Sequence, residues 1–482
     1  MHRKSSVRLA FTSLGRYHSP MRHGRIHPLV VCCPFFLAGA LCSCGDSGSS
    51  PSAAADSGHD ADAGKTDSDS PPSDASGDVQ PDIAVVDAHA DSPDALLPEG
   101  ATDAACPPIG GAWSIATVDS DPGFKARVAV AVGNDDLVRL AYNVATSSDG
   151  WSNFELRVAE QTSQGFEKKT VVPSEQGVSA EFPTLAVDDA GTMHVVYNQY
   201  MLSEKQIEVF MLSGSLAGGF GSPVNLTQTA EADENGAVVA LGPDGTLHVV
   251  FMQRVAIPDK PGKFDYATGY VAVDGSGPKD RITLAEGTLL FSGVPEQGVA
   301  VDGAGRVHVV YLRPGTDPSR GVLHHRVKDA SGWSAETAIT ADGENVTGIS
   351  VAASDAGKVF FTYGKGKVDV TMTYRSLEGA TLSPEVPLTS STQDRPYYLG
   401  LRPMGADGVF LTFLRLVNSN ADVFFLSAEQ DVFGAEEAIT QTPAEDETVA
   451  SLAVGRCGEA HVGFVENLST APHGRVLLAT RK

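Results

Sequence analysis

The sequence has few positive charges and few cysteines, and both shortages limit what the protein can be. Its 482 residues contain 35 Lys and Arg against 60 Asp and Glu, a formal charge of -25. A chain this acidic repels phosphate backbones and anionic lipid headgroups, so we expect no nucleic-acid partner. Four of the six cysteines lie in the first 44 residues, and beyond them only Cys106 and Cys457 remain.

Patterns typical of helices and of several enzyme classes are also missing. Residues 106–482 contain no helical hydrophobic period of useful length. Nucleophile-elbow, P-loop and zinc-binding signatures are absent, and no spacing of carboxylates picks out a pair for glycoside chemistry. The sequence therefore predicts no catalytic residue and no cofactor, and it favours a protein that is not an enzyme.

The first 43 residues have the layout of an export signal. Residues 21–27 are basic, and the apolar stretch PLVVCCPFFLAGAL follows, too short to anchor stably across a bilayer. Leu41-Cys42-Ser43-Cys44 resembles the bacterial lipobox, with Leu three positions before the last cysteine and a small residue directly before it. The resemblance implies that Cys44 is acylated and becomes the mature N-terminus. Translation from Met21 fits this layout; an ordinary cleaved signal is the alternative.

Residues 44–105 have the composition of a solvated tether. They are rich in Asp, Ala, Ser, Gly and Pro, with fourteen acids and one Lys after Cys44. Such a segment cannot bury enough apolar surface to fold, so we expect it to be disordered and extended by self-repulsion. Its Asp-x-Asp steps lack the spacing of a calcium loop. The tether would hold the following domain on average about 40 Å or more from the lipid.

Residues 106–482 repeat one short pattern seven times. VDDAGTMHVVY (187–197) and VDGAGRVHVVY (301–311) show it most clearly. Each copy ends in an aromatic residue, and the copies recur every 50 to 60 residues, a period typical of propellers and arrays. These aromatics are Tyr142, Tyr197, Phe251, Tyr311, Tyr363, Phe413 and Phe464.

The strand count within these repeats predicts the fold. Each copy indicates a strand, a tight turn at Asp and Gly, and a second strand rich in β-branched residues; a third strand and a short fourth follow. Seven third strands occur, but only six fourth strands, because the chain stops at Lys482. GAWSIATVD (111–119) resembles the outer-strand segment GWSAETAIT (332–340). We therefore predict an all-β, seven-bladed propeller over 106–482, closed by this N-terminal strand.

The two cysteines of the domain are expected at the same end of the ring. Cys106 precedes the closing strand, and Cys457 lies in the first hairpin turn of the same blade. We predict a Cys106–Cys457 disulfide that locks the ring, worth roughly 4–5 kcal/mol in the chain-entropy model. Two free thiols are the alternative.

The histidines of the repeat predict packing rather than metal binding. His194, His248, His308 and His461 occupy one repeat position, where the other copies carry Arg or Phe. Blades hold these positions too far apart for one metal ion. We expect hydrogen-bonded histidines between blades and no metal site.

The Asp-x-x-Gly hairpins resemble the blades of the sialidase-like superfamily, including BNR-repeat-like proteins. The resemblance covers most of 112–482 and implies the propeller fold. The repeats lack the Trp of the sialidase Asp box, and the chain has no Phe/Tyr-Arg-Ile-Pro arginine. Sialidase activity is therefore not implied.

A second group of repeat positions predicts a ligand site. The residues two places past each aromatic are Val144, Gln199, Gln253, Arg313, Lys365, Arg415 and Glu466. Arg313, Lys365 and Arg415 fall on three adjacent blades and could hold an anion such as an acidic sugar. The alternative is that these cations neutralise, between blades, a rim of acids at Glu181, Glu296, Glu344 and Asp394.

Two further features are placed at the same face. The segment 252–270 is the longest expected loop there, and long loops on a rigid ring often carry specificity. Tyr397 and Tyr398 could stack on a sugar or pack beneath the loop.

Together these features predict a monomeric, lipid-anchored protein of the bacterial cell envelope, at the outer membrane. Its propeller would bind a glycan or protein, with Gln199, Gln253, Arg313, Lys365, Arg415 and Tyr397 as candidate ligand-binding residues. A polysaccharide-active hydrolase or lyase and a non-catalytic scaffold are the alternatives.

Overall fold

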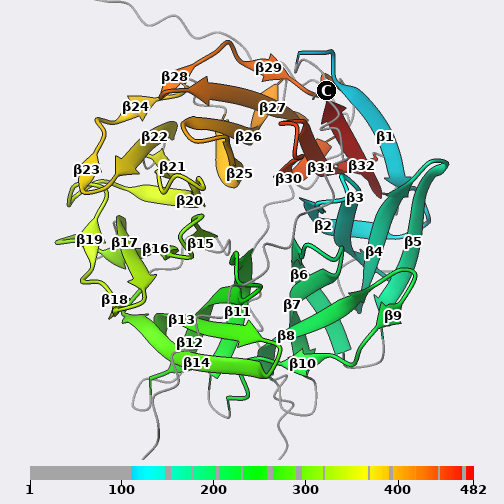
Figure 1. Ribbon diagram of the computed structural model, residues 1–482, viewed down its shortest axis with the longest axis horizontal. Helices are drawn as coiled ribbons and strands as arrows, with labels where there is room; N and C mark the ends of the chain where they lie inside the picture. The colour runs from blue at the N-terminus through cyan, green and yellow to red at the C-terminus, as the bar shows by residue number, and fades with distance from the viewer. Residues whose placement is uncertain are drawn as a thin grey trace, which may run out of the picture. The chain divides into compact units, whose positions relative to one another are not determined.

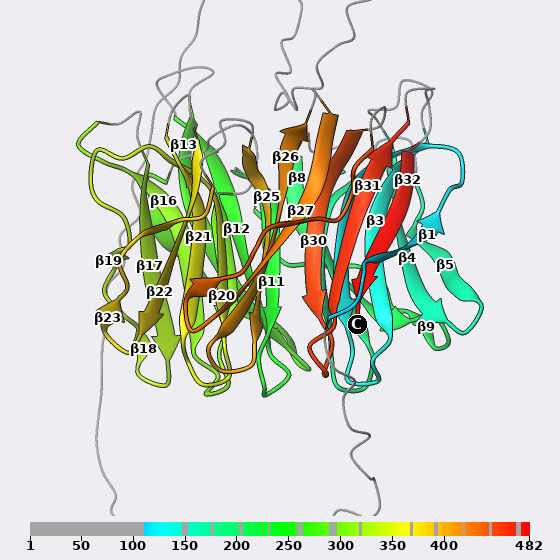
Figure 2. The ribbon, with the colours of Figure 1, turned by 90° about the horizontal axis from the view of Figure 1, so that it is seen from above.

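The computed structural model is a closed ring of seven antiparallel sheets (Figures 1 and 2). It describes residues 110–482 apart from short gaps at 147–152, 175–177, 202–205, 230–231, 258–263, 289–295, 318–320, 367–369, 390–393, 418–419, 443–445 and 469–473. The predicted signal, Cys44, the tether and Cys106 lie outside the described residues. No helix long and apolar enough to cross a membrane occurs in the part of the chain described.

Blades 1 to 3 follow the predicted order of strands, from the ring axis outward. Blade 1 contains β2 (Phe124–Val132), β3 (Val138–Ala145), β4 (Phe154–Thr162) and β5 (Gly165–Val172). Blade 2 contains β6 (Val178–Val187), β7 (Met193–Met201), β8 (Gln206–Ser215), β9 (Gly219–Phe220) and β10 (Val224–Asn225). Blade 3 contains β11 (Ala232–Leu241), β12 (Leu247–Ala256), β13 (Phe264–Asp274) and β14 (Gly277–Glu286).

Blades 4 to 6 share one layout, in which the outer strand is divided into two short pieces. Blade 4 contains β15 (Gln297–Val301), β16 (Val307–Pro314), β17 (Gly321–Asp329), β18 (Gly332–Trp333) and β19 (Thr337–Ala338). Blade 5 contains β20 (Val346–Ala353), β21 (Val359–Lys365), β22 (Thr371–Glu378), β23 (Thr381–Leu382) and β24 (Val386–Pro387). Blade 6 contains β25 (Asp394–Met404), β26 (Gly408–Val417), β27 (Asn420–Glu429), β28 (Val432–Phe433) and β29 (Glu437–Ala438).

Blade 7 joins the two ends of the described chain. It contains β30 (Asp446–Val454), β31 (Ala460–Asn467) and β32 (Gly474–Arg481), and its outer strand is β1 (Ser114–Asp119). Ser114 pairs with Thr480 and Thr117 with Leu477 in antiparallel register. The predicted closure by the N-terminal strand is confirmed, and it covers the sheet edge that β32 would otherwise expose.

The hairpin turns and the core follow from the repeat. Gly191, Gly245 and Gly305 have φ values of 75° to 79°, the left-handed region that the tight turn requires. The seven repeat aromatics are fully buried. Hydrophobic clusters extend across the blade junctions, so Tyr142 of blade 1 packs in one cluster with Val465 and Leu478 of blade 7. Burial between neighbouring blades therefore helps to stabilise the ring.

The predicted long loop is mostly strand. Of the segment 252–270, residues up to Ala256 extend β12 and residues from Phe264 onward begin β13. The two extensions pair with each other, with Ala256 opposite Phe264. Alternating β-branched and aromatic residues there continue the hairpin, a signal that the two prolines and two lysines of the segment obscured.

Candidate functional site

Each of the three predicted cations pairs with a glutamate that lies between the two short pieces of the outer strand in its own blade. Arg313 lies 3.1 Å from Glu336, and Lys365 lies 2.7 Å from Glu385. Arg415 makes a bidentate contact with Glu436, with 2.7 Å between Nη2 and Oε2. Of the predicted rim acids, Glu344 lies 2.5 Å from Lys365. The three cations are ion-paired, as in the alternative that the sequence left open, but within their own blades, and only Glu344 of these partners belongs to the predicted acidic rim.

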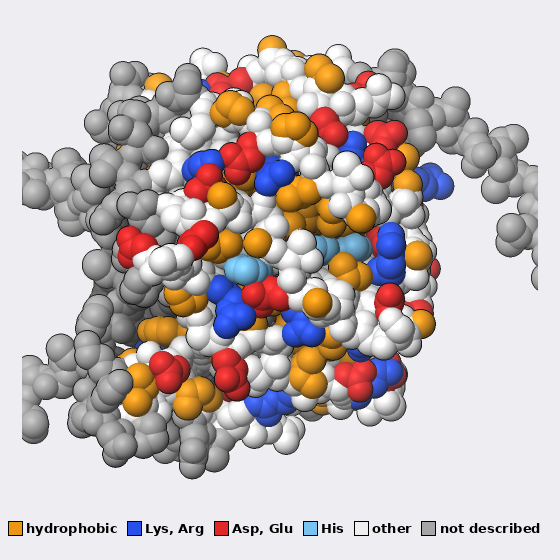
Figure 3. Space-filling model, turned by 90° about the vertical axis from the view of Figure 1, so that its left-hand side faces the viewer, with side chains coloured by type: hydrophobic (Ala, Val, Ile, Leu, Met, Phe, Trp, Pro, Cys, Tyr) orange, Lys and Arg blue, Asp and Glu red, His pale blue; other side chains and the backbone are white. Residues whose placement is uncertain are grey.

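A short motif at the break in the outer strand explains these pairs. The glutamates follow β18, β23 and β28 by three residues, in WSAE, LSPE and FGAE. In two blades the repeat tyrosine joins the pair: Tyr311 and Tyr363 each donate a 2.8 Å hydrogen bond to the glutamate. On the outer wall seen in Figure 3, acidic and basic side chains are interspersed rather than gathered in one basic patch.

The remaining predicted site residues lie on separate strands. Gln199 is buried and accepts a hydrogen bond from Tyr197. Gln253 donates to the buried Glu234 of the neighbouring strand at 3.4 Å. Tyr397 lies in β25. The ligand-binding role of the six predicted residues stays a prediction, because none of these contacts tests it.

The repeat histidines are bonded within their own blades, so the predicted bonds between blades are wrong. His194 contacts Ser213, His248 contacts Tyr270, and His461 contacts Thr480, each on the adjacent third strand. Burial lowers the pKa of His248 and of His461 to about 4. The histidine points along its own sheet, where the third strand supplies the nearest partner. Among the described residues, no three His, Cys, Asp or Glu are placed to hold a metal ion.

The most elaborate polar cluster was missed from the sequence, although a second repeat marks it. LTQTAEADEN (226–235) and ITQTPAEDET (439–448) share Thr-Gln-Thr and Asp-Glu at the same spacing. Each segment leads from the outer strand of one blade into the inner strand of the next. The two copies therefore stand at the junctions of blades 2 and 3 and of blades 6 and 7.

At the junction of blades 2 and 3, the buried Glu234 is fully engaged. Thr229 Oγ1 lies 2.8 Å from both of its carboxylate oxygens. Gln253 donates to Oε1, and Arg281 on β14 lies 3.7 Å from the same oxygen. Thr227 and the Thr229 amide bond the nearby Glu208. This carboxylate therefore has both an amide donor and a cation from its own blade.

The junction of blades 6 and 7 keeps the same framework with different partners. Thr440 Oγ1 and the Thr442 amide donate to the buried Asp422 at 3.2 and 3.0 Å. Thr442 Oγ1 donates to Glu447 Oε1 at 2.8 Å. The second oxygen of Glu447, which is fully buried, has no hydrogen-bond partner among the residues that the structure describes.

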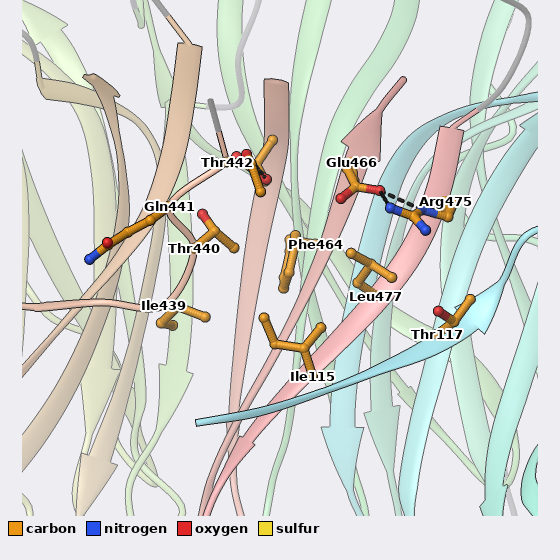
Figure 4. Close-up of a pocket in the computed structure, with 11 residues that line it drawn as sticks. Ile115, Thr117, Ile439, Thr440, Gln441, Thr442, Phe464, Glu466, Arg475 and Leu477 are labelled. Atoms are coloured by element: carbon orange, nitrogen blue, oxygen red, sulfur yellow. Dashed lines mark hydrogen bonds and ion pairs between the residues drawn. The ribbon is translucent and has the colours of Figure 1, made fainter. Parts of the chain in front are cut away.

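A pocket of about 260 Å³ opens beside this carboxylate. Figure 4 shows Thr440, Gln441 and Thr442 on one side of it, with Glu466, Arg475 and Leu477 on the other. Phe464 lies between the two sides. Ile115 of the closing strand also lines the pocket and is half exposed. The pocket thus combines an apolar wall with three ionisable groups, Glu447, Glu466 and Arg475.

The charges around the pocket differ in state. Burial raises the pKa of Glu447 to about 8. The hydrogen bond from Thr442 lowers this pKa, but repulsion from Asp422 and Glu466 offsets part of that effect. Glu447 is therefore largely protonated at neutral pH. Glu466, opposite Glu447 on β31, forms an ion pair with Arg475. One carboxylic acid and one carboxylate consequently face each other across paired strands.

At the junction of blades 7 and 1, the position equivalent to Glu234 and Glu447 holds a basic residue instead of an acid. Lys125 of β2 occupies the register position of Glu234 and Glu447, and it too is fully buried. Its ammonium donates to the Asp121 carbonyl, while Asp119 pairs with Lys168 at 2.7 Å. A charged residue at this position, held by the segment before the inner strand, is therefore a recurring feature of the ring.

The predicted disulfide is only half within the described residues. Cys457 lies in the turn between β30 and β31, at the position that the prediction requires. Cys106 is outside the described residues, so the pairing stays a prediction.

Comparison with known proteins finds similar solved structures at low sequence identity. No family model matches it, and no curated protein matches it. A protein of unknown function from Dyadobacter fermentans aligns with 10% identity and a TM-score of 0.49, covering 64% of this chain and 96% of the other. The Hadza microbial sialidase Hz136 aligns with 15% identity and a TM-score of 0.43, covering 64% and 66%.

A third solved structure, an ulvan lyase of polysaccharide lyase family PL25, aligns with 8% identity and a TM-score of 0.44. It covers 65% of this chain and 80% of the other. One of these three solved structures is thus a sialidase and one is a polysaccharide lyase. At these identities and TM-scores the likeness carries no argument about activity.

Proposed function

We propose that the chain is a lipid-anchored binding protein of the bacterial cell envelope, whose propeller binds a glycan or protein ligand. The lipobox-like Leu41-Cys42-Ser43-Cys44 supports the anchor, and the acidic residues 45–105 support a solvated stalk between lipid and ring. Both features describe a domain displayed away from a membrane.

One observation carries the binding role: the pocket between blades 6 and 7 is built around a buried carboxylate with an unpartnered oxygen. Buried polar atoms in folded proteins are nearly always hydrogen-bonded, because an unpaired one costs free energy. A ligand that supplies the missing donor removes this cost on binding. The pocket is concave and mixes apolar walls with a few polar groups, as small-molecule sites do.

A second candidate function, polysaccharide cleavage, is favoured by the state of two facing residues. Glu447 is largely protonated and could act as an acid, while Glu466 is an ion-paired carboxylate. A carboxylic acid beside a carboxylate is the arrangement that glycoside hydrolases use. The pocket's small volume supports recognition of one sugar unit at most.

The proposal is tested by screening the full-length protein on an array of neutral, acidic and amino glycans, and against envelope proteins. Glu447→Gln and the triple variant Arg313→Ala/Lys365→Ala/Arg415→Ala are screened alongside. We expect a glycan or protein ligand whose signal is lost in the Glu447 variant. If the parent protein releases reducing sugar from that ligand and the Glu447→Gln variant does not, the result supports polysaccharide cleavage as the function.

The triple variant separates the two candidate locations. Loss of binding to acidic glycans in this variant alone would locate the ligand at blades 4 to 6, as the sequence predicts. A third outcome is that the folded protein binds no glycan but captures an envelope protein, and that neither variant reduces this capture. This outcome would indicate a scaffold and overturn the proposed ligand site.

A further inference from the structure

We propose that the pocket between blades 6 and 7 binds a primary ammonium group carried on a short apolar chain, with Glu447 receiving the ammonium. This inference rests on the proposed binding function and names the chemical group that its pocket recognises. A lysine side chain and an amino sugar both offer a primary ammonium group, and the experiment below distinguishes them.

The first argument is the unpartnered oxygen. Glu447 is one of the residues that line the pocket. Its Oε1 is bonded by Thr442, whereas its buried Oε2 lacks a donor among the described residues. A carboxylate oxygen accepts hydrogen bonds, and those from a charged donor are about twice as strong as those from a neutral one. An ammonium group supplies three such donors.

The second argument is an internal comparison within the chain. At the junction of blades 2 and 3, Arg281 provides the cation near the equivalent Glu234. Arg281 lies two residues before Thr283 on the outer strand, and Thr283 pairs with Gly269 opposite the repeat aromatic. In blade 7 this position, two residues before Thr117, holds Ile115.

The matching amide is also replaced. Gln253, which donates to Glu234, corresponds to Glu466 beside Glu447, since both lie two residues past the repeat aromatic and opposite the buried acid. The junction of blades 6 and 7 thus has no cation at the position of Arg281 and has Glu466 in place of the amide, and its own cation, Arg475, pairs with Glu466. The site retains the carboxylate without the internal group that satisfies its counterpart.

The third argument is the shape and chemistry of the walls. Ile115, Ile439, Phe464 and Leu477 line the pocket and suit an alkyl chain. A cation near the face of an aromatic ring such as Phe464 gains further attraction. Glu447, Glu466 and the neighbouring Asp422 outnumber the single cation Arg475, so a positive ligand is favoured over a negative one.

Binding of an ammonium group should displace a proton from Glu447. The charged groups that face Glu447 are Asp422 on β27, Glu466 on β31 and Arg475 on β32, while β1 presents Ile115 and Thr117. The negative charges of Asp422 and Glu466 favour the protonated form of Glu447, and so does the burial of its side chain. Affinity for an ammonium ligand is therefore expected to rise up to about tenfold per pH unit below pH 8 and to level above it.

The experiment measures binding of n-butylammonium to the full-length protein by isothermal titration calorimetry. 1-Butanol serves as the neutral control of the same chain length. We expect saturable binding of the amine, release of close to one proton per site at pH 7 in paired buffers, and no binding of the alcohol. Nα-acetyl-lysine amide, glucosamine and N-acetylglucosamine then identify the source of the ammonium group.

Two substitutions exchange the residues at the equivalent positions 115 in blade 7 and 281 in blade 3, and so test the comparison between these blades. Ile115→Arg places at blade 7 the cation that blade 3 already has, at a half-exposed position, and should abolish amine binding in a folded protein. Arg281→Ile removes the cation near Glu234 and should raise the stoichiometry from one site toward two. Glu447→Gln, similar in size to the parent residue, should lower the affinity at least tenfold.

The outcomes separate this inference from the proposed function. Failure of butylammonium to bind at pH 8, or equal binding of 1-butanol, overturns the ammonium site, even where the array finds a glycan or protein ligand. Amine binding that Ile115→Arg leaves intact also overturns it. Amine binding blocked by Ile115→Arg supports the site, even where the array finds no larger ligand and the proposed function fails.

Discussion

Buried carboxyl groups at the blade junctions are the residues that should govern how stability depends on pH. Burial raises the pKa of Glu447 and of Glu296 to about 8, and that of Glu234 to about 7. In the unfolded chain these groups titrate near 4.5. Between those values the folded state holds protons that the unfolded state has released, so stability falls as the pH rises.

The buried histidines act in the opposite direction over a lower range. His248 and His461 have a pKa of about 4 in the fold and 6.5 when unfolded. Between these pH values the unfolded state binds more protons at the two histidines than the folded state does. Their contribution to stability therefore rises with pH up to 6.5 and is constant above it. The two histidines offset part of the decline caused by the three acids below pH 6.5 and none of it above. We therefore expect the decline of stability to steepen above pH 6.5, to as much as about 1.4 kcal/mol per pH unit for each buried acid.

Glu447→Gln should make that decline shallower, because glutamine cannot lose a proton. Urea unfolding of parent and variant at pH 6.5, 7.25 and 8 measures the two slopes. A variant that declines as steeply as the parent would show that Glu447 is already ionised in the folded protein at pH 6.5.

The Tyr363–Glu385–Lys365 cluster should contribute to stability at neutral pH. Burial acts to raise the pKa of Glu385, but the hydrogen bonds from Lys365 and Tyr363 outweigh it, and the pKa lies below its usual value. The contribution is therefore present above about pH 4.5 and is lost as the pH falls. Glu385→Gln should lower the free energy of unfolding by about 1–2 kcal/mol at pH 7.

Blade 6 provides the matched control for this substitution. Its repeat aromatic is Phe413, which has no hydroxyl to lose a partner, and Arg415 also stacks on Phe424 at 4.7 Å. Glu436→Gln should therefore cost less than Glu385→Gln in the same denaturation experiment. Equal losses in the two blades would exclude a role for the Tyr363 hydroxyl.

At the scale of elements, the outer strand is where the blades differ. Blades 1 and 3 have one continuous outer strand, whereas blades 2 and 4 to 6 have two short pieces, and blade 7 takes its outer strand from the start of the domain. The break in blades 4 to 6 carries the glutamate that meets the cation of the second strand. Local irregularity at the ring's edge thus places charged side chains that the regular inner strands do not.

Removal of β1 should convert the closed ring into a protein with an open edge. A chain that begins at Gly123 leaves the hydrogen-bonding groups of β32 uncovered, and exposed sheet edges pair with other chains. We expect a lower melting temperature and concentration-dependent association in light scattering. A truncated protein that stays monomeric with an unchanged melting temperature would mean that β1 does not stabilise the ring.

The predicted Cys106–Cys457 bond would reinforce the same closure. Cys457→Ser should lower the free energy of unfolding by roughly 4–5 kcal/mol if the disulfide forms, as the chain-entropy model gives for long loops. Treatment of the parent with reductant should have the same effect and should not affect the variant. If reductant leaves the parent's stability unchanged, the two cysteines are free thiols.

At the scale of the whole molecule, the anchor and the ring should be separable. Cys44→Ser removes the acceptor of the acyl chains but leaves residues 106–482 intact. The variant should move from the membrane fraction to the soluble fraction and lose palmitate labelling, while its melting temperature stays within about 1 °C of the parent, since surface changes far from a core have little effect. Unchanged fractionation would indicate an ordinary cleaved signal or another anchor.

The sequence alone determined the architecture, because its signals are local. Alternation of apolar residues, Asp-Gly turns and seven recurring aromatics specify strands and their order, and the imbalance of third and fourth strands specifies the closure by 111–119. The same repeats could not specify the partners of Arg313 or His194, since which acid or hydroxyl lies nearest depends on side-chain packing.

Only the tertiary structure revealed the pocket. Its walls come from the closing strand, from the segment between blades 6 and 7, and from β31 and β32, so residues more than 300 positions apart meet there. The second oxygen of Glu447 lacks a partner among the described residues because Ile115 and Glu466 occupy the positions at which blade 3 has Arg281 and Gln253. Periodicity fixes which strand a residue occupies, but the ion pairs depend on which side chains meet within a blade, and the pocket depends on the contacts that the closed ring creates.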